Sequence, residues 1–147
     1  YISELASALS PSAERSLETH AMGEAFVIAV SAGWPSRQLE TWISHLDTPI
    51  TYPVAIGLAT SPYELDQTVV LSAYATSVIS NLLSAAIRLS VIGQSDAQVI
   101  QAGLESLVDS QAEKLTDATL DQLGSACLMS DLCSIQHETM NTRLFRT

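Results

Sequence analysis

The chain has 147 residues and a mass of 15.7 kDa, about the size of one domain with one sizeable core. Its 16 Asp and Glu residues outnumber 6 Lys and Arg residues, so the formal charge is -10 and the pI is near 4.4. This balance argues against nucleic acid and anionic membranes as partners. Hydrophobic residues form 47% of the chain and aromatic residues only 5%, which favours an ordered helical fold over a disordered acidic tail.

Helix signals follow one another in the first part of the chain. Ser10 and Pro11 predict a helix start, and apolar residues then recur at helical spacing until Gly33. Ser36 opens a short amphipathic helix. The apolar run over residues 54–59 fits a strand by periodicity alone, but no neighbouring strand pattern exists to pair with it.

A long central helix is the next predicted element. Residues 61–64 (SPYE) combine a capping box with proline at the first helical position, and this is the clearest predicted helix start. The helix runs to Arg88, lacks charge over residues 67–87, and carries hydroxyl residues at every fourth position: Thr68, Ser72, Thr76, Ser80 and Ser84. Its length could span a bilayer, but these polar atoms favour a buried position at the centre of a bundle.

Further helices complete the predicted fold. Gly93 is expected to cap the central helix, and residues 95–98 form a second capping box. The pattern weakens over residues 116–125, and a last short helix follows. The sequence therefore predicts an all-α, single-domain antiparallel helical bundle over residues 1–136, followed by a C-terminal arm over residues 137–147.

Motifs for common enzyme chemistry are absent from the sequence. There is no G-x-x-x-x-G-K-[ST] or G-x-G-x-x-G phosphate cradle and no G-x-S-x-G nucleophile elbow. His137 and Glu138 begin an H-E-x-x-H pattern, but Asn141 stands where the second histidine is needed. The scattered acidic residues indicate solvated faces, so no catalytic residue is predicted.

The two cysteines are too few for a disulfide scaffold and favour a reducing, cytosolic setting. Cys133 and His137 are four residues apart and could face one way on a helix, which makes a soft metal site conceivable. Two ligands without a third make a poor site, so a buried thiol and a hydrogen-bonded histidine are the favoured interpretation.

Cationic residues are rare, and three of them stand out. Arg88 follows the uncharged stretch and must reach the surface, pair with a carboxylate or serve a partner, of which pairing is favoured. Arg143 and Arg146 flank Leu144 and Phe145, an arrangement that suits a docking arm. From the residues alone, an arm folded back on its own domain is equally compatible.

The C-terminal segment HETMNTRLFRT resembles the signature of the UreF family of urease accessory proteins, which usually reads close to HETQYSRLFRS. Met140 and Asn141 depart from that signature. Residues 85–94 (AAIRLSVIGQ) look like the family segment AAIKLVPLGQ, with Arg88 in place of lysine and Val91 in place of proline. Weaker agreement at MG (22–23) and YPVAIG (52–57) extends the resemblance over nearly the whole chain.

The resemblance implies an all-α, non-enzymatic scaffold for urease maturation in the cytoplasm. UreF-like proteins form a homodimer, bind UreD (or UreH) and recruit the GTPase UreG, and this complex inserts nickel into apo-urease. The chain would thus be the C-terminal portion of such a protein, without the family's N-terminal segment, with no stably bound cofactor and with a possible effect on GTP hydrolysis by UreG. The residues carried over as partner-binding are His137, Glu138, Arg143, Leu144, Phe145, Arg146, Arg88 and Gln94.

Two alternatives to this scaffold stay open. The chain could be a direct nickel-binding carrier that uses Cys133 and His137, or an unrelated helical domain for protein interaction.

Overall fold

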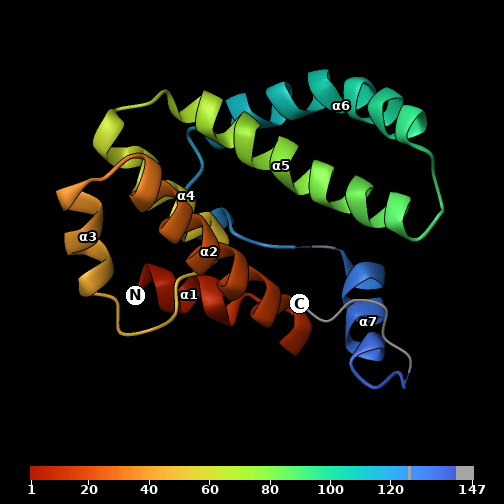
Figure 1. The fold of residues 1–147 in the computed structure, drawn as a ribbon, viewed down its shortest axis with the longest axis horizontal. Coiled ribbons are helices and arrows are strands. Elements are labelled where there is room, and N and C mark those ends of the chain that lie inside the picture. Colours follow the sequence, from red (N-terminus) through yellow and green to blue (C-terminus); the bar gives the residue numbers. More distant parts are fainter. Residues whose placement is uncertain (126, 142–147) are drawn as a thin grey trace. The chain divides into compact units, whose positions relative to one another are not determined.

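A computed structural model of the chain describes residues 1–125 and 127–141. These residues form helices and no strand, which confirms the all-α prediction (Figure 1). The elements are α1 (Ile2–Ala8), α2 (Ala13–Gly33), α3 (Arg37–Ser44), α4 (Tyr52–Thr60), η1 (Ser61–Tyr63), α5 (Gln67–Arg88), α6 (Gln94–Leu115), η2 (Leu120–Gln122) and α7 (Leu128–His137). Contacts divide the chain into two compact units, Tyr1–Glu64 with Gly124–Thr147, and Leu65–Leu123. The predicted boundary between residues 136 and 137 stays a prediction.

Helix α4 is the centre of the first unit, where it contacts α1, α2 and α3. Its residues Ala55 and Ala59 are buried, as is Leu39 of α3. Helix α2 approaches the start of α4 at Gly23, where an added Cβ would lie 2.4 Å from the carbonyl oxygen of Ile50. Only glycine permits this close approach, because any side chain would collide with backbone.

The apolar run that also fitted a strand forms the body of α4. Pro53 lies in the first turn, where its fixed φ suits a helix and its missing N–H is not needed. The N–H of Tyr52 donates to Thr19 Oγ1 of α2 at 3.2 Å. The Tyr52 ring also meets Phe26 edge-on, with ring centroids 5.7 Å apart. Helix formation is therefore supported by contacts with α2.

The predicted start of α2 was displaced by two residues. Ser12, not Ser10, is the N-cap, and its Oγ accepts from the N–H of Arg15 at 3.1 Å. Ser10 instead follows α1, and its N–H donates to the carbonyl oxygen of Ser7. Pro11 therefore precedes the cap and does not occupy the first helical position. The predicted end of the helix at Gly33 is confirmed.

The capping box predicted at residues 61–64 was wrong. Ser61 to Tyr63 form the short 3₁₀ helix η1, and Glu64 follows in the left-handed region with φ of 51°. Asp66 caps α5 instead, because its Oδ1 accepts from the N–H of Val69 at 3.1 Å. A left-handed residue cannot continue a right-handed helix, so η1 and α5 are separate elements.

Gly93 was also misplaced by the sequence prediction. The chain leaves α5 through Ser90, which has φ of 59°, and Gly93 is the N-cap of α6. Asp96 Oδ2 accepts from the N–H of Gly93 at 3.1 Å, so it is the carboxylate that closes the start of α6. The predicted second helix start is thus present, but its N-cap is Gly93, two residues before the predicted Ser95, and the helix begins at Gln94.

The second unit is a hairpin of α5 and α6 joined by residues 89–93 (Figure 1). The two helices are antiparallel, because later positions on α5 pair with earlier positions on α6. Side-chain hydrogen bonds join the two helices: Thr68 to Thr116 at 3.2 Å, Ser72 to Asp109 at 3.2 Å and Ser80 to Gln101 at 3.4 Å. We name this line of contact the α5–α6 seam. The predicted close approach of a neighbour along the hydroxyl stripe is therefore confirmed.

The prediction that this helix is buried at the centre of a bundle was wrong for the described residues. No residue of α5 is fully buried, because within its unit the only long helix against it is α6. Among the described residues α5 is also the one helix long and apolar enough to cross a membrane, and a single such helix is weak evidence for a span. Its hydroxyl groups serve the contact with α6.

Candidate functional site

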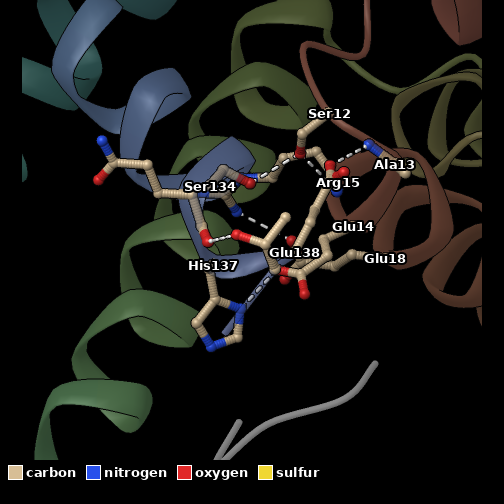
Figure 2. A network of polar contacts seen from close by, with 10 residues as sticks. Ser12, Ala13, Glu14, Arg15, Glu18, Ser134, His137 and Glu138 are labelled. Atoms are coloured by element: carbon tan, nitrogen blue, oxygen red, sulfur yellow. Dashed lines mark hydrogen bonds and ion pairs between the residues drawn. The ribbon is translucent and has the colours of Figure 1, made fainter. Parts of the chain in front are cut away.

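The last turn of α7 lies against the first turn of α2, and we name this region the α2–α7 junction (Figure 2). Both helices belong to the first unit. Three polar contacts join them: Ser12 Oγ to Ser134 Oγ at 2.7 Å, Glu14 Oε2 to His137 Nδ1 at 2.6 Å, and the N–H of Ala13 to Glu138 Oε1 at 2.7 Å. The start of the C-terminal signature is therefore held by residues more than a hundred positions earlier.

Glu138 accepts a hydrogen bond from a backbone amide at the N-terminus of α2. Ala13 is the first helical residue, and its N–H has no partner within the helix. The Glu138 carboxylate accepts this N–H while Ser12 accepts that of Arg15, so two of the free amides at this end are satisfied. A negative charge here also interacts favourably with the positive end of the helix dipole.

His137 and Glu14 form the second polar contact. A carboxylate can only accept, so Nδ1 of His137 carries the hydrogen, and no hydrogen bond of Nε2 is described within residues 1–125 and 127–141. The two side chains are 32% and 24% exposed, so water weakens the interaction between them. The next residue of α2, Arg15, pairs with Glu18 at 2.9 Å, so four charged or polar side chains lie near this end of the helix (Figure 2).

The apolar side chains of α7 are exposed in the structure. Leu128, Leu132 and Ile135 lie on one face at helical spacing, and Met129 stands beside them. Leu128 is 67% exposed and Met129 is 72% exposed. Since the described attachment of α7 to α2 includes three polar contacts at its last turn, the helix is held at one end while its apolar face stays accessible.

The predicted partner-binding residues fall in different places. His137 and Glu138 lie at the α2–α7 junction. Arg88 and Gln94 are exposed in the second unit, at the last residue of α5 and the first of α6, so the short connection brings them to one end of the hairpin. The remaining four lie outside the described residues: Arg143, Leu144, Phe145 and Arg146.

The nickel-carrier alternative gains no support from the geometry. Among residues 1–125 and 127–141, no group of three or more His, Cys, Asp or Glu side chains is placed to hold a metal ion. Cys133 is exposed, contrary to the predicted buried thiol. The predicted hydrogen bond of His137 is confirmed by its contact with Glu14.

One carboxyl group in the second unit has a displaced pKa. Thr119 Oγ1 donates to Asp121 Oδ1 at 2.6 Å, and this hydrogen bond lowers the pKa of Asp121 below its usual value. The pair belongs to the turn that forms η2 and is exposed to solvent. The hydrogen bond therefore belongs to the structure of a turn, and the shift gives no indication of acid or base chemistry.

Sequence reasoning missed the partners that α2 provides at the junction. Ser12 and Glu14 carried usable signals, since a serine followed by an acidic residue in the first turn is typical of a helix start. The neighbouring Ser10 and Pro11 offered the same signal two residues earlier. Nothing in the local pattern indicated that this helix start would receive α7.

Comparison with known proteins identifies the family. The UreF family model matches residues 1–105. The urease accessory protein UreF of Bradyrhizobium diazoefficiens is 43% identical over 146 residues, and that of Rhodopseudomonas palustris (strain BisB5) is 42% identical over 147 residues. These alignments cover 99% and 100% of this chain and 60% of each relative. UreF of Methylobacterium sp. (strain 4-46) is 40% identical over 99% of this chain and 58% of its own length.

The match extends over most of the described structure. The family model covers α1 to α5 and the first half of α6, and the pairwise alignments continue through α7 and the junction. The chain spans about three fifths of the length of these curated relatives. The resemblance that rested on the C-terminal signature therefore holds along the chain as a whole, and the chain belongs to the UreF family.

Proposed function

We propose that this chain serves urease maturation as a non-enzymatic scaffold. The observation that carries the proposal is its identity of 42–43% over nearly the whole chain with proteins named urease accessory protein UreF. The sequence has no phosphate-binding loop, so any nucleotide chemistry of the process falls to a partner. A scaffold needs accessible surface, and the apolar face of α7 and the exposed end of the α5–α6 hairpin supply it.

The partners we propose are UreD or UreH, the GTPase UreG and apo-urease, with nickel as cargo of the complex and not as a resident cofactor. The chain would act in the cytoplasm, as a homodimer, and would alter the rate at which UreG hydrolyses GTP. Support for protein partners comes from the acidic charge of -10, which disfavours polyanions, and from the exposed apolar residues of α7.

The α2–α7 junction is our proposed contact region for UreD or UreH. Within the described residues, Nε2 of His137 and the second carboxylate oxygen of Glu138 have no hydrogen bond, so a partner can bind both without breaking the contacts with α2. The arm that follows would add Arg143 and Arg146 as donors and Leu144 and Phe145 as apolar anchors. Arg88 and Gln94 form a second proposed contact, at the end of the hairpin.

Complementation tests the function. The full-length protein should restore urease activity in cells that lack their own UreF, and deletion of residues 143–147 should abolish both this activity and co-purification with UreD. Helical circular dichroism should keep the signal of α1 to α7, because all of these helices end before the deletion. A deleted protein that still co-purifies with UreD would remove the arm from the binding surface, and a full-length protein that restores no activity would overturn the proposed function.

The second contact has its own test. Arg88→Ala should lower urease activation in the same cells, because a guanidinium at an exposed helix end offers donors that alanine lacks. Arg37→Ala is the matched control, since Arg37 is exposed in the first turn of α3. Equal activation by the two variants would remove Arg88 from the functional residues.

A further inference from the structure

A hollow follows the seam between α5 and α6 within the second unit. Its larger part, of about 700 Å³, is lined by Val69, Ser72, Ala73 and Thr76 of α5 and by Asp109 and Glu113 of α6. A smaller part, of about 320 Å³, meets it at Thr76 and Asp109 and reaches Glu105. The seam is hollow because α5 contributes small side chains there, which leave space above the contact with α6.

One side of this seam is a row of carboxylates. Glu105, Asp109 and Glu113 are four residues apart on α6, so successive carboxylates are separated by about 6 Å along the helix. Asp109 accepts from Ser72 at 3.2 Å, whereas Glu105 and Glu113 have no described hydrogen bond or ion pair. All three are exposed and line the hollow, so their charges lie beside whatever occupies it.

The opposite side of the seam is neutral. Helix α5 has no charged residue from position 67 to position 87, and the hollow on this side is lined by hydroxyl and apolar groups. Val69 is 63% exposed and Ala73 is also exposed, so apolar surface remains uncovered beside the carboxylates. The seam therefore offers one charged and one apolar side along the same groove.

The acidic side and the apolar side of the seam together indicate what kind of molecule can bind there. A second copy of the chain is a poor occupant, because it brings a net charge of -10 and the same acidic row. Nucleic acid and anionic lipid are repelled for the same reason. A helix with lysine or arginine at every fourth position on one side and small apolar residues on the other matches both the carboxylate spacing and the apolar side.

We infer that the α5–α6 seam is a docking groove for a cationic amphipathic helix of another protein. The cations pair with Glu105, Asp109 and Glu113, and the apolar residues cover Val69 and Ala73, so the docked helix completes a three-helix arrangement on the hairpin. Two to three turns suffice, because eight residues separate Glu105 from Glu113 and span about 12 Å. The inference is independent of the urease role, since it rests on the geometry of the seam.

The test uses a synthetic helical peptide of alanine, leucine and lysine, with the lysines four residues apart on one side. Binding to the full chain is measured by titration calorimetry. The triple substitution Glu105→Gln, Asp109→Asn and Glu113→Gln should weaken binding about tenfold, through the loss of three exposed ion pairs. A peptide with glutamate in place of each lysine should not bind.

The control triple is Glu24→Gln, Glu40→Gln and Asp47→Asn, which removes the same charge from exposed positions of the first unit. It should change the affinity by less than about twofold, because only the long-range field is altered. Equal weakening by the two triples would overturn the inference, since it would mean unspecific attraction to an acidic chain. Absence of binding to the unsubstituted chain would also overturn it, and would indicate that another part of the protein covers the seam.

A single blocking substitution gives an independent measurement. Ala73→Arg places a cation and a long side chain in the groove and should weaken peptide binding, while Ala25→Arg adds the same charge at an exposed position of α2 and should not. Circular dichroism of both variants verifies that the helices are intact. Unchanged binding by Ala73→Arg would contradict docking in the seam.

Discussion

Gly23 sets how closely α2 approaches α4, and its replacement tests the packing of the first unit. In Gly23→Ala the added Cβ would lie 2.4 Å from the carbonyl oxygen of Ile50 and 2.8 Å from the carbonyl carbon of Thr51. Both atoms are backbone, so the helices must separate. We expect the free energy of unfolding to fall by about 1–3 kcal/mol, the usual cost of overpacking. Urea denaturation followed by circular dichroism measures the change.

Gly57→Ala is the matched control for this prediction. Gly57 lies in the middle of α4, and an added Cβ there meets nothing within 4 Å. Alanine should raise the free energy of unfolding by about 0.5–1 kcal/mol, because it favours the helix without a collision. If both substitutions stabilise the chain, the close approach at Gly23 is not the reason for glycine there.

Substitution of Glu14 tests whether its contact with His137 keeps α7 against α2. Glu14→Gln removes the carboxylate that contacts His137 Nδ1, so α7 should open more often. We expect hydrogen exchange of the α7 amides, residues 128–137, to accelerate by up to about fivefold, since a partly exposed contact contributes at most about 1 kcal/mol. Glu18→Gln is the control, because Glu18 pairs with Arg15 on its own helix. Equal acceleration in both variants would show that the charge of α2 matters and the contact does not.

At the level of the helix, two serines, Ser10 and Ser12, are candidate N-caps of α2, and substitution of each one tests which of them stabilises the helix. Ser12→Ala removes the hydroxyl that accepts from Arg15 N–H and contacts Ser134, so we expect a loss of about 1 kcal/mol in the free energy of unfolding. Ser10→Ala should change this quantity little, because no side-chain hydrogen bond is described for Ser10. Thermal unfolding of the two variants gives the comparison, and a greater loss for Ser10→Ala would restore the start predicted from the sequence.

The periodicity of apolar residues predicted most of the helices, but it placed only some of the helix ends correctly. The amphipathic helix α3 and the long helix α5 were predicted because their apolar spacing is a local property. The start of α5 was misplaced because Ser61 and Asp66 are both good caps, and the left-handed Glu64 decides between them. The sequence pattern carries no signal for that backbone choice, which depends on how the chain turns from α4 to α5.

The placement of the proposed site residues could be predicted where they are neighbours in sequence and was missed where they are not. Arg88 and Gln94 were expected near a helix boundary, and a five-residue connection places them there. His137 and Glu138 were singled out, but their partners Ala13 and Glu14 lie more than a hundred residues away. A contact over such a separation follows from packing of whole helices, which single-sequence periodicity does not specify.

For the whole molecule, the balance of charge and exposed apolar surface predicts self-association that depends on salt. Leu128 and Met129 on α7 and Leu82 on α5 are each more than half exposed, and burying such surface favours association. The net charge of -10 opposes it. Raising the ionic strength from about 0.1 M to about 1 M shortens the screening length from about 10 Å to about 3 Å, so we expect a larger fraction of dimer in sedimentation velocity.

The same change in salt should act in the opposite direction on the α5–α6 seam. Binding of the lysine peptide depends on attraction to Glu105, Asp109 and Glu113, which screening weakens, whereas self-association is opposed by repulsion, which screening also weakens. One protein preparation, measured at low and high salt, should therefore lose peptide affinity while it gains dimer. If both processes strengthen with salt, the peptide binds by apolar contact alone and the carboxylate row does not select its partner.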